Sequence, residues 1–125
     1  MVEEQDLDAG DWQVYPAIDL RRGRVVRLMQ GDPRRETAYA RDPVRVARRW
    51  VEAGATWLHV VNLDGALGED GAENLAALAR ILDTVGEDAV SSPDGPRVQF
   101  GGGLRDLASV RRVLDLGVRR VVFGT

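Results

Sequence analysis

The sequence predicts an α/β fold that is half of a (β/α)8 TIM barrel, with parallel strands in βαβαβαβ order that end after the fourth strand. Continuous apolar segments alternate with amphipathic segments of helical spacing, a pattern typical of a parallel sheet covered by helices. An open, doubly wound sheet also fits this order. Polar residues or glycines at four strand ends favour the barrel, where such positions form the active face. A whole barrel needs about 250 residues, and the chain has 125.

Five apolar segments are the predicted strands. Four of them carry the parallel order, and the fifth, over residues 24–30, is a short strand or one arm of a hairpin. The other four cover residues 14–20, 56–63, 97–100 and 118–123. Polar stretches over 31–41 and 86–96 are predicted loops, because they lack apolar periodicity.

Three amphipathic segments are the predicted helices, and each has a capping residue at its start. Asp42 precedes a proline, Asn74 precedes the second helix, and Asp106 precedes the third. Gly54 and Gly117 are placed to end the first and third helices. The residues predicted to face inward in the third helix are Leu107, Val110, Val113 and Leu114.

The composition excludes several kinds of chemistry. The chain contains no Cys, and all 17 basic residues are Arg, so thiolate chemistry and the lysine of a Schiff base or P-loop are absent. The single histidine, His59, cannot form a two-histidine metal site, and no metal ligands are predicted. Carboxylates remain for acid–base catalysis. A formal net charge of -3 argues against a nucleic-acid partner.

The sequence shows no targeting signal. Residues 1–13 are acidic and lack the basic and apolar regions of a signal peptide. The apolar segments are too short to cross a bilayer. We therefore expect a cytoplasmic protein with no membrane partner. The expected organisation is an acidic N-terminal tail over 1–13 followed by one half-barrel phosphate-binding domain over 14–125.

The clearest candidate site is a run of three glycines between a predicted strand and a predicted helix. Residues 101–103 do not match a GxGxxG dinucleotide motif, because Asp106 occupies its last position. A glycine turn entering a helix presents backbone N–H groups to a phosphate, and we favour this over an unliganded turn. Arg105 is either a second contact for that anion or a solvated residue. Gly124 and Thr125 end the next strand and suit the second wall of a phosphate cradle.

Asp19 is the candidate general acid or base. It ends an apolar predicted strand, where partial burial raises the pKa of a carboxyl group, although a capping role also fits. Arg27 is a candidate partner of Asp19 or of a substrate. Asp64 fits a turn and a functional role equally well, and His59 fits a core or helix-facing position better than a catalytic one. Paired arginines are interpreted as solvated surface residues, among them Arg21-Arg22 and Arg119-Arg120.

Four ordered motifs resemble a known enzyme family. They are YPAIDL at 15–20, VVRLMQG at 25–31, LHVVNLDGA at 58–66 and FGGGLR at 100–105. Together they are similar to the N-terminal half of the histidine-biosynthesis isomerases that act on phosphoribosylformimino-5-aminoimidazole carboxamide ribotide. The related cyclase subunit of imidazole glycerol phosphate synthase typically has Cys-Leu-Asp where this chain has Ala17-Ile18-Asp19, so the isomerase family is the closer match.

The resemblance implies an aldose–ketose isomerase that uses no metal or organic cofactor. In its Amadori rearrangement an aminoaldose ring opens, a proton leaves C2′ and an aminoketose forms. Asp19 matches the family's catalytic Asp, and Arg105 matches an arginine that contacts the small-molecule phosphoribosyl substrate. The residues that match one of its two phosphate sites are Gly102, Gly103, Gly124 and Thr125.

The same resemblance implies an incomplete active site. The family's second catalytic Asp and second phosphate site lie in a C-terminal half that this sequence does not contain. Either that half or a second copy of the chain would complete the barrel, and we expect the chain alone to be inactive and poorly stable. The alternative functions are a non-catalytic phosphate-binding half-barrel that requires a partner chain, or half of the related cyclase subunit of imidazole glycerol phosphate synthase. Asn62 stands where the family commonly has Asp, which changes the local charge but not the candidate base.

Overall fold

The computed structural model of the chain describes residues 14–29, 32–40, 42–90 and 95–123. The predicted tail over 1–13 and the predicted cradle residues Gly124 and Thr125 lie outside the described residues. Within the described ranges, no helix combines the length and the hydropathy of a membrane span.

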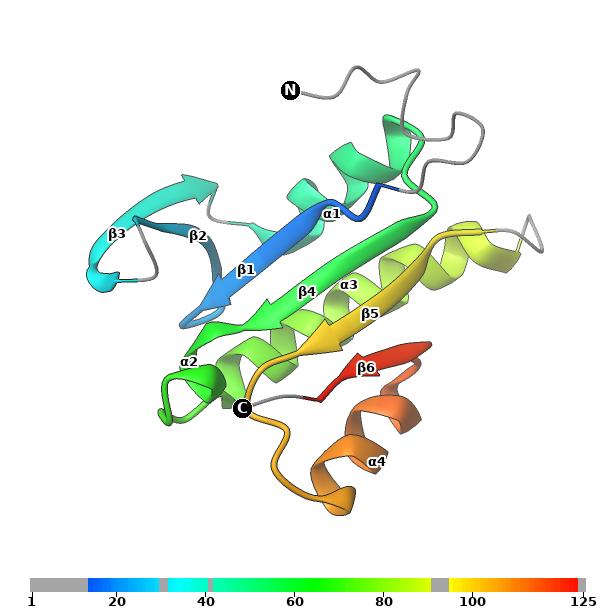
Figure 1. Cartoon of the computed structure of the whole chain (residues 1–125). Helices are drawn as coiled ribbons and strands as arrows, with labels where there is room; N and C mark the ends of the chain where they lie inside the picture. Colours follow the sequence, from blue (N-terminus) through cyan, green and yellow to red (C-terminus); the bar gives the residue numbers. More distant parts are fainter. Residues whose placement is uncertain (1–13, 30–31, 41, 91–94, 124–125) are drawn as a thin grey trace.

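Six strands of the described part of the chain form one sheet in the order β3-β2-β1-β4-β5-β6. The four parallel strands are β1 (Ala17–Arg21), β4 (Trp57–Asn62), β5 (Arg97–Gly101) and β6 (Arg120–Val122). Each parallel strand is added on the same side of the one before it (Figure 1). A doubly wound sheet reverses at a switch point, whereas a barrel adds its strands in sequence order. The strand order therefore confirms the predicted partial barrel.

An antiparallel hairpin lies beside β1, and only one of its two arms was predicted, the one over residues 24–30. β2 (Arg24–Met29) pairs with β1 and with β3 (Asp32–Ala40), where we expected a polar loop over 31–41. Residues 32–40 contain several charged side chains and no apolar alternation, and this composition favours a loop. Backbone pairing with β2 nevertheless forms a strand, with register shifts at two points. The predicted loop is wrong because pairing, not side-chain pattern, determines this edge.

Two of the helices begin and end at predicted residues. α1 (Pro43–Glu52) begins after Asp42, whose carboxylate accepts a backbone N–H in the first turn. α4 (Leu107–Leu116) begins after Asp106, which forms a capping box. Gly117 then ends α4 in the left-handed backbone conformation that glycine adopts without strain. Both predicted caps at these starts are confirmed.

The other two helices differ from the predictions. α2 (Leu63–Ala66) is a short helix that contains Asp64, where a turn was one of the two expectations. α3 (Ala72–Val90) begins two residues before Asn74, so that residue is inside the helix and is not its cap. α3 also continues through Gly86, because one glycine costs a helix only about 1 kcal/mol.

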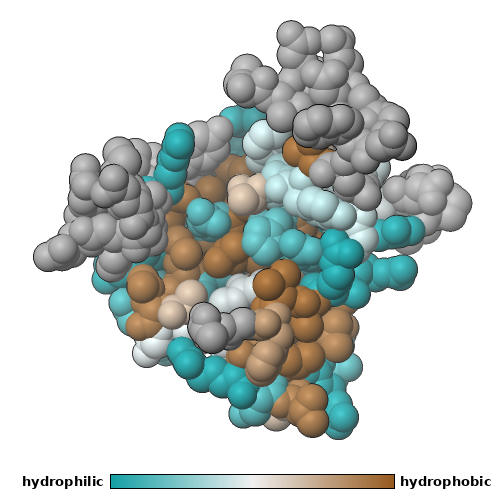
Figure 2. Space-filling model, viewed as in Figure 1, coloured by the Kyte–Doolittle hydropathy of each residue, from teal (hydrophilic) through white to brown (hydrophobic). Residues whose placement is uncertain are grey.

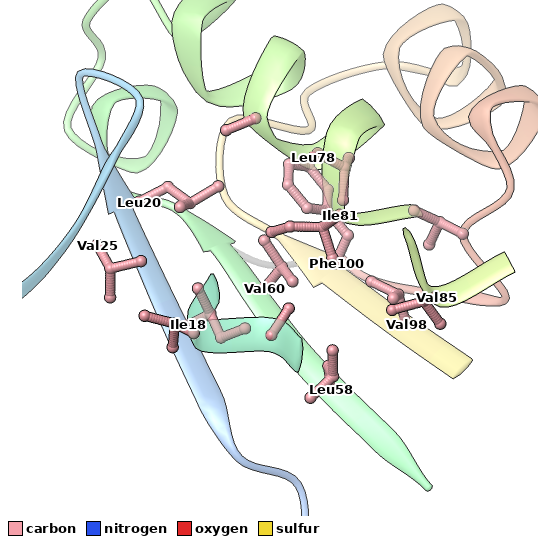
Figure 3. Close-up of a cluster of buried hydrophobic side chains, with 14 of the residues drawn as sticks. Ile18, Leu20, Val25, Leu58, Val60, Leu78, Ile81, Val85, Val98 and Phe100 are labelled. Carbon is pink, nitrogen blue, oxygen red and sulfur yellow. The ribbon is translucent and has the colours of Figure 1, made fainter. Parts of the chain in front are cut away.

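The core lies between one face of the sheet and the helices. Side chains of β1, β4 and β5 point toward those of α3 in Figure 3. Those labelled there include Ile18, Leu20, Leu58, Val60, Val98, Phe100, Leu78 and Ile81. α4 contributes the buried Val113, whereas Leu107 and Leu114, predicted to face inward, are 79% and 42% exposed. Alternate strand residues fill this core, so the intervening ones face the other side of the sheet.

Candidate functional site

The side of the parallel sheet that faces away from the core carries polar side chains from all four parallel strands. We call the surface formed by Asp19, His59, Gln99 and Arg120 the open face. In Figure 1 the strands lie in front of α3, and the same view in Figure 2 shows hydrophilic and hydrophobic residues intermixed across this side. The register aligns His59 with Gln99, and Gln99 with Arg120, on adjacent strands.

Asp19 lies on the open face in the middle of β1. The strand ends at Arg21, one residue beyond the predicted bound at 20, so Asp19 lies two residues before the end of the strand. Burial raises the pKa of the Asp19 carboxyl group, and the nearby His59 partly opposes this shift. Arg27, exposed on β2, lines the same hollow of about 270 Å³ as Asp19. A half-buried carboxyl group with a raised pKa is a stronger base than a solvated one and is a candidate for general acid–base catalysis.

The glycine turn follows β5 and packs directly against the end of β4. Gly102 and Gly103 have positive φ angles of 98° and 75°. A Cβ on Gly102 would overlap the carbonyl oxygen of Asn62 and lie 3.0 Å from its carbonyl carbon. A Cβ on Gly103 would lie 2.8 Å from the Cα of Gly65. Both the backbone conformation and the close approach therefore require glycine at these positions.

A hollow of about 250 Å³ opens beside this turn. Its lining includes the turn glycines, Arg105 and His59. Arg105 is exposed, and its Nη2 donates a hydrogen bond to the carbonyl oxygen of Gly65 over 3.2 Å. The guanidinium group is thereby held near the turn. Backbone N–H groups at a glycine turn and an adjacent arginine are a combination that binds phosphate.

His59 connects the two parts of the candidate site. Asp19 and the glycine turn line different hollows, whereas His59 lines the glycine hollow and interacts electrostatically with Asp19. The expectation of a core or helix-facing histidine is wrong, because the neighbouring Leu58 and Val60 face the helices. Strand alternation was the signal that could have placed His59 on the other face.

A second polar cluster, which we call the strand-end network, was missed entirely. The Arg21 Nη1 lies 3.0 Å from Oδ1 of Asp64, with both side chains less than a tenth exposed. Asp64 Oδ2 also accepts the backbone N–H of Arg22 over 2.7 Å and the Nδ2 of Asn74 over 3.0 Å. Arg21 is therefore not solvated, and Asp64 is more than a turn residue. Arg21 and Asp64 are 43 residues apart in sequence, and local sequence patterns do not reveal such a contact.

Asn74 links this network to the ends of both central strands. Its Oδ1 accepts the backbone N–H of Gly23 over 2.7 Å. Its Nδ2 lies within hydrogen-bond distance of the Leu20 carbonyl oxygen, Asn62 Oδ1 and Asp64 Oδ2, at 2.9, 2.8 and 3.0 Å. Two hydrogens serve three acceptors, so one hydrogen is shared. Asn62 uses the same Oδ1 to accept the Gly65 N–H, which fixes α2 beside the glycine turn.

Replacing Gly102 with Ala is expected to destabilise the chain more than replacing Gly68 with Ala. Both glycines have positive φ, but a Cβ on Gly68 meets nothing within 4 Å. The Gly68 variant therefore loses about 1–2 kcal/mol through backbone conformation alone. The Gly102 variant adds the overlap with Asn62. Urea denaturation of the two variants measures the difference, and equal losses would contradict the close packing of the turn.

The sequence profile of a family described as "Histidine biosynthesis protein" matches residues 13–125. Three similar proteins, from Symbiobacterium thermophilum, Syntrophobacter fumaroxidans and Moorella thermoacetica, are 50%, 51% and 52% identical over 112 residues. Each is named 1-(5-phosphoribosyl)-5-((5-phosphoribosylamino)methylideneamino)imidazole-4-carboxamide isomerase. The matches cover 90% of this chain but only 43%, 40% and 42% of these relatives, so the chain spans less than half of their length. The chain belongs to the histidine biosynthesis protein family.

Proposed function

We propose that this chain supplies the first half of the active site of an aldose–ketose isomerase of histidine biosynthesis. The observation that carries the proposal is the joint placement of a proton-exchanging carboxyl group and a glycine turn at the same sheet. Asp19 and His59 occupy neighbouring strands of the open face, and His59 shares a hollow with the turn and Arg105. The relatives' name contains two phosphoribosyl groups, which suits a substrate held by a phosphate while carbon chemistry takes place beside it.

Asp19 is the proposed general base of the Amadori rearrangement. After the aminoaldose ring opens to an imine, a carboxylate removes the proton from C2′ and the imine nitrogen is protonated, which gives an enaminol. Loss of the 2′-hydroxyl proton and protonation at C1′ then complete the aminoketose. Burial raises the pKa of Asp19, so the carboxylate is a stronger base than a fully solvated one. The reaction moves protons within one molecule, and its substrate and product have the same composition.

The glycine turn is the proposed site for one substrate phosphate. The capping box of α4 already uses the Ser109 N–H, and this hydrogen bond holds the pKa of Asp106 below its usual value. We therefore assign phosphate binding to the N–H groups of the turn, including Gly102 and Gly103, and to Arg105 rather than to the helix end alone. Gly124 and Thr125 remain the proposed second wall of this cradle.

The proposed site needs a partner to be complete. We propose that either a C-terminal half-barrel or a second copy of this chain closes the open face and supplies the second carboxylate and the second phosphate site. The same proposal places the chain in the cytoplasm, as expected for an enzyme of amino-acid biosynthesis. Size measurement of the chain at high concentration distinguishes the two partners, because only self-association yields a dimeric mass.

A chimera tests the proposed function. Residues 13–125 of this chain replace the matching segment of the Symbiobacterium thermophilum relative, and the chimera is assayed for the rearrangement beside the unaltered relative. Turnover by the chimera supports the isomerase assignment. If the folded chimera shows no turnover while the separate 125-residue chain still binds inorganic phosphate, the result would instead favour the non-catalytic phosphate-binding half-barrel.

Replacing Arg105 with Ala is expected to weaken binding of inorganic phosphate to the chain about tenfold. The guanidinium group lies beside the turn, and a hydrogen bond to a charged group contributes about 1.5 kcal/mol. Calorimetric titration measures the dissociation constant. Arg111, exposed on α4, is the matched control, and the Arg111→Ala variant is expected to bind as the original chain does. Equal effects of the two substitutions would contradict a specific contact.

A further inference from the structure

The open face contains a row of side chains that bond to one another across three strands. Gln99 lies between His59 and Arg120, its direct neighbours in the register of β4, β5 and β6. Arg120 Nε donates to Gln99 Oε1 over 2.9 Å. Gln99 Nε2 and His59 Nδ1 are also 2.9 Å apart. We call these three residues the open-face relay.

The chemistry of the relay determines which way each group points. A guanidinium group has donors and no acceptor, so the Gln99 atom that faces Arg120 must be the amide oxygen. The amide nitrogen of Gln99 then faces His59 and donates to its Nδ1. An Nδ1 that accepts a hydrogen bond carries no proton, so the proton of the neutral ring is on Nε2.

Arg120 is held in position by aromatic rings. Its guanidinium carbon lies 4.4 Å from the ring centroid of Trp57 and 5.5 Å from that of Tyr15. The two rings pack edge to face, with centroids 5.8 Å apart. Cation–π contacts on two rings restrict the arginine, which would otherwise move freely as an exposed side chain. The relay is thus anchored at its far end.

The geometry points to Gln99 and Arg120 as positioning residues. They hold His59 as neutral imidazole with its proton on Nε2, where it is a hydrogen-bond donor to the hollow at the glycine turn. This inference rests on the proposed function, because the donor would act beside the proposed base and the proposed phosphate cradle. His59 lines the hollow at the glycine turn. A neutral donor polarises a substrate oxygen or nitrogen without placing a full positive charge next to Asp19.

The charged groups around His59 oppose one another. Asp19 on β1 attracts a proton to the ring. The positively charged groups on the same face are Arg105, which lines the hollow, and Arg120 on β6, which bonds to Gln99. Arg97 on β5 adds a further positive charge near the ring of Trp57. Burial lowers the pKa of His59, with Asp19 as the opposing influence. The Gln99 N–H also disfavours protonation of the ring, because a protonated Nδ1 would be a second donor facing the Gln99 donor.

The single histidine makes this inference directly testable. Nitrogen NMR of the 125-residue chain gives one pair of imidazole signals, and the shifts of the two ring nitrogens report which one carries the proton. We expect a protonated Nε2 and an unprotonated Nδ1 at neutral pH. A proton on Nδ1, or a histidine fully charged at neutral pH, would overturn the inference. These NMR measurements do not depend on isomerase activity, so the inference about His59 can fail while the proposed function stands.

Two variants separate a positioning role from simple packing. Gln99→Glu replaces the donor with an acceptor of the same shape, so the proton is expected to move to Nδ1 and the pKa of His59 to rise by about one unit. Arg120→Met releases the Gln99 amide, so signals of both tautomers are expected. Arg119→Met, an exposed neighbour outside the relay, is the matched control and should leave the spectrum unchanged. An unaltered His59 tautomer in folded Gln99→Glu would contradict the relay.

Discussion

Replacing Asp19 with Asn is expected to lower the kcat of the chimera by about 10²–10⁴-fold, the usual contribution of a general base. Asparagine keeps the size and much of the hydrogen bonding of the side chain but cannot remove a proton from carbon. Substrate binding should change little, because the proposed phosphate contacts lie at the glycine turn. Asp83→Asn, an exposed change on α3, serves as the matched control. Full turnover by the Asp19→Asn chimera would reject the assigned role.

The same substitution is expected to stabilise the 125-residue chain at neutral pH. Burial raises the pKa of Asp19 in the folded state, so the folded state holds its proton more tightly than the unfolded state does. This stabilising contribution is present below the unfolded value of about 3.8 and is lost as pH rises through the folded pKa. Above that range the buried carboxylate is a cost that asparagine removes. Urea denaturation at acidic and neutral pH should show the gain only at the higher pH.

The pH profile of kcat gives an independent check on the base. Catalysis needs the ionised carboxylate, so kcat should fall as pH decreases through the raised pKa of Asp19. The midpoint of the fall should lie above the usual value of an aspartate side chain. A midpoint below that value would show that another group controls the profile.

The sequence alone predicted the parallel strands and their order because those signals are local. Buried strands appear as continuous apolar runs, and helix starts appear as capping residues such as Asp42 and Asp106. The β3 strand could not be predicted in this way, because its sequence has no apolar alternation and it pairs with β2 at the edge of the sheet. Local patterns therefore identify strands with an apolar sequence and miss a strand whose sequence lacks that pattern.

The same distinction separates the parts of the candidate site that the sequence predicted from the parts that it did not. Asp19 and the glycine turn were found because a carboxylate within an apolar segment and three consecutive glycines after one are visible in the sequence itself. The direction of His59 depends on strand alternation, and its bond to Gln99 depends on the register between two strands. Arg120 looked like one of many surface arginines until the fold placed Trp57 beneath it. Residue types alone cannot show such contacts, since they arise between strands about 20–40 residues apart.

Replacing Arg21 with Met is expected to lower the free energy of unfolding by about 3–5 kcal/mol. The substitution leaves the Asp64 carboxylate buried, with its hydrogen bonds to Arg22 and Asn74 but without the guanidinium group that lies 3.0 Å away. A buried charge that loses its opposite charge retains its desolvation cost. Arg22→Met, at the exposed neighbouring position, is the control and should change stability much less. Urea denaturation measures both values.

The decisive comparison adds Asp64→Asn to the Arg21→Met chain. Asparagine still offers an oxygen to the Arg22 N–H but carries no charge, so the double variant should be more stable than Arg21→Met alone. A packing role for Arg21 predicts the opposite, because the second substitution would then only add a further loss. Since Asn62 and Asn74 connect this pair to α2 and Gly65 lies against the glycine turn, phosphate binding should fall in Arg21→Met and recover in part in the double variant. Stability and phosphate affinity that change together would show that the strand-end network positions the cradle; recovery of stability without recovery of affinity would separate the two.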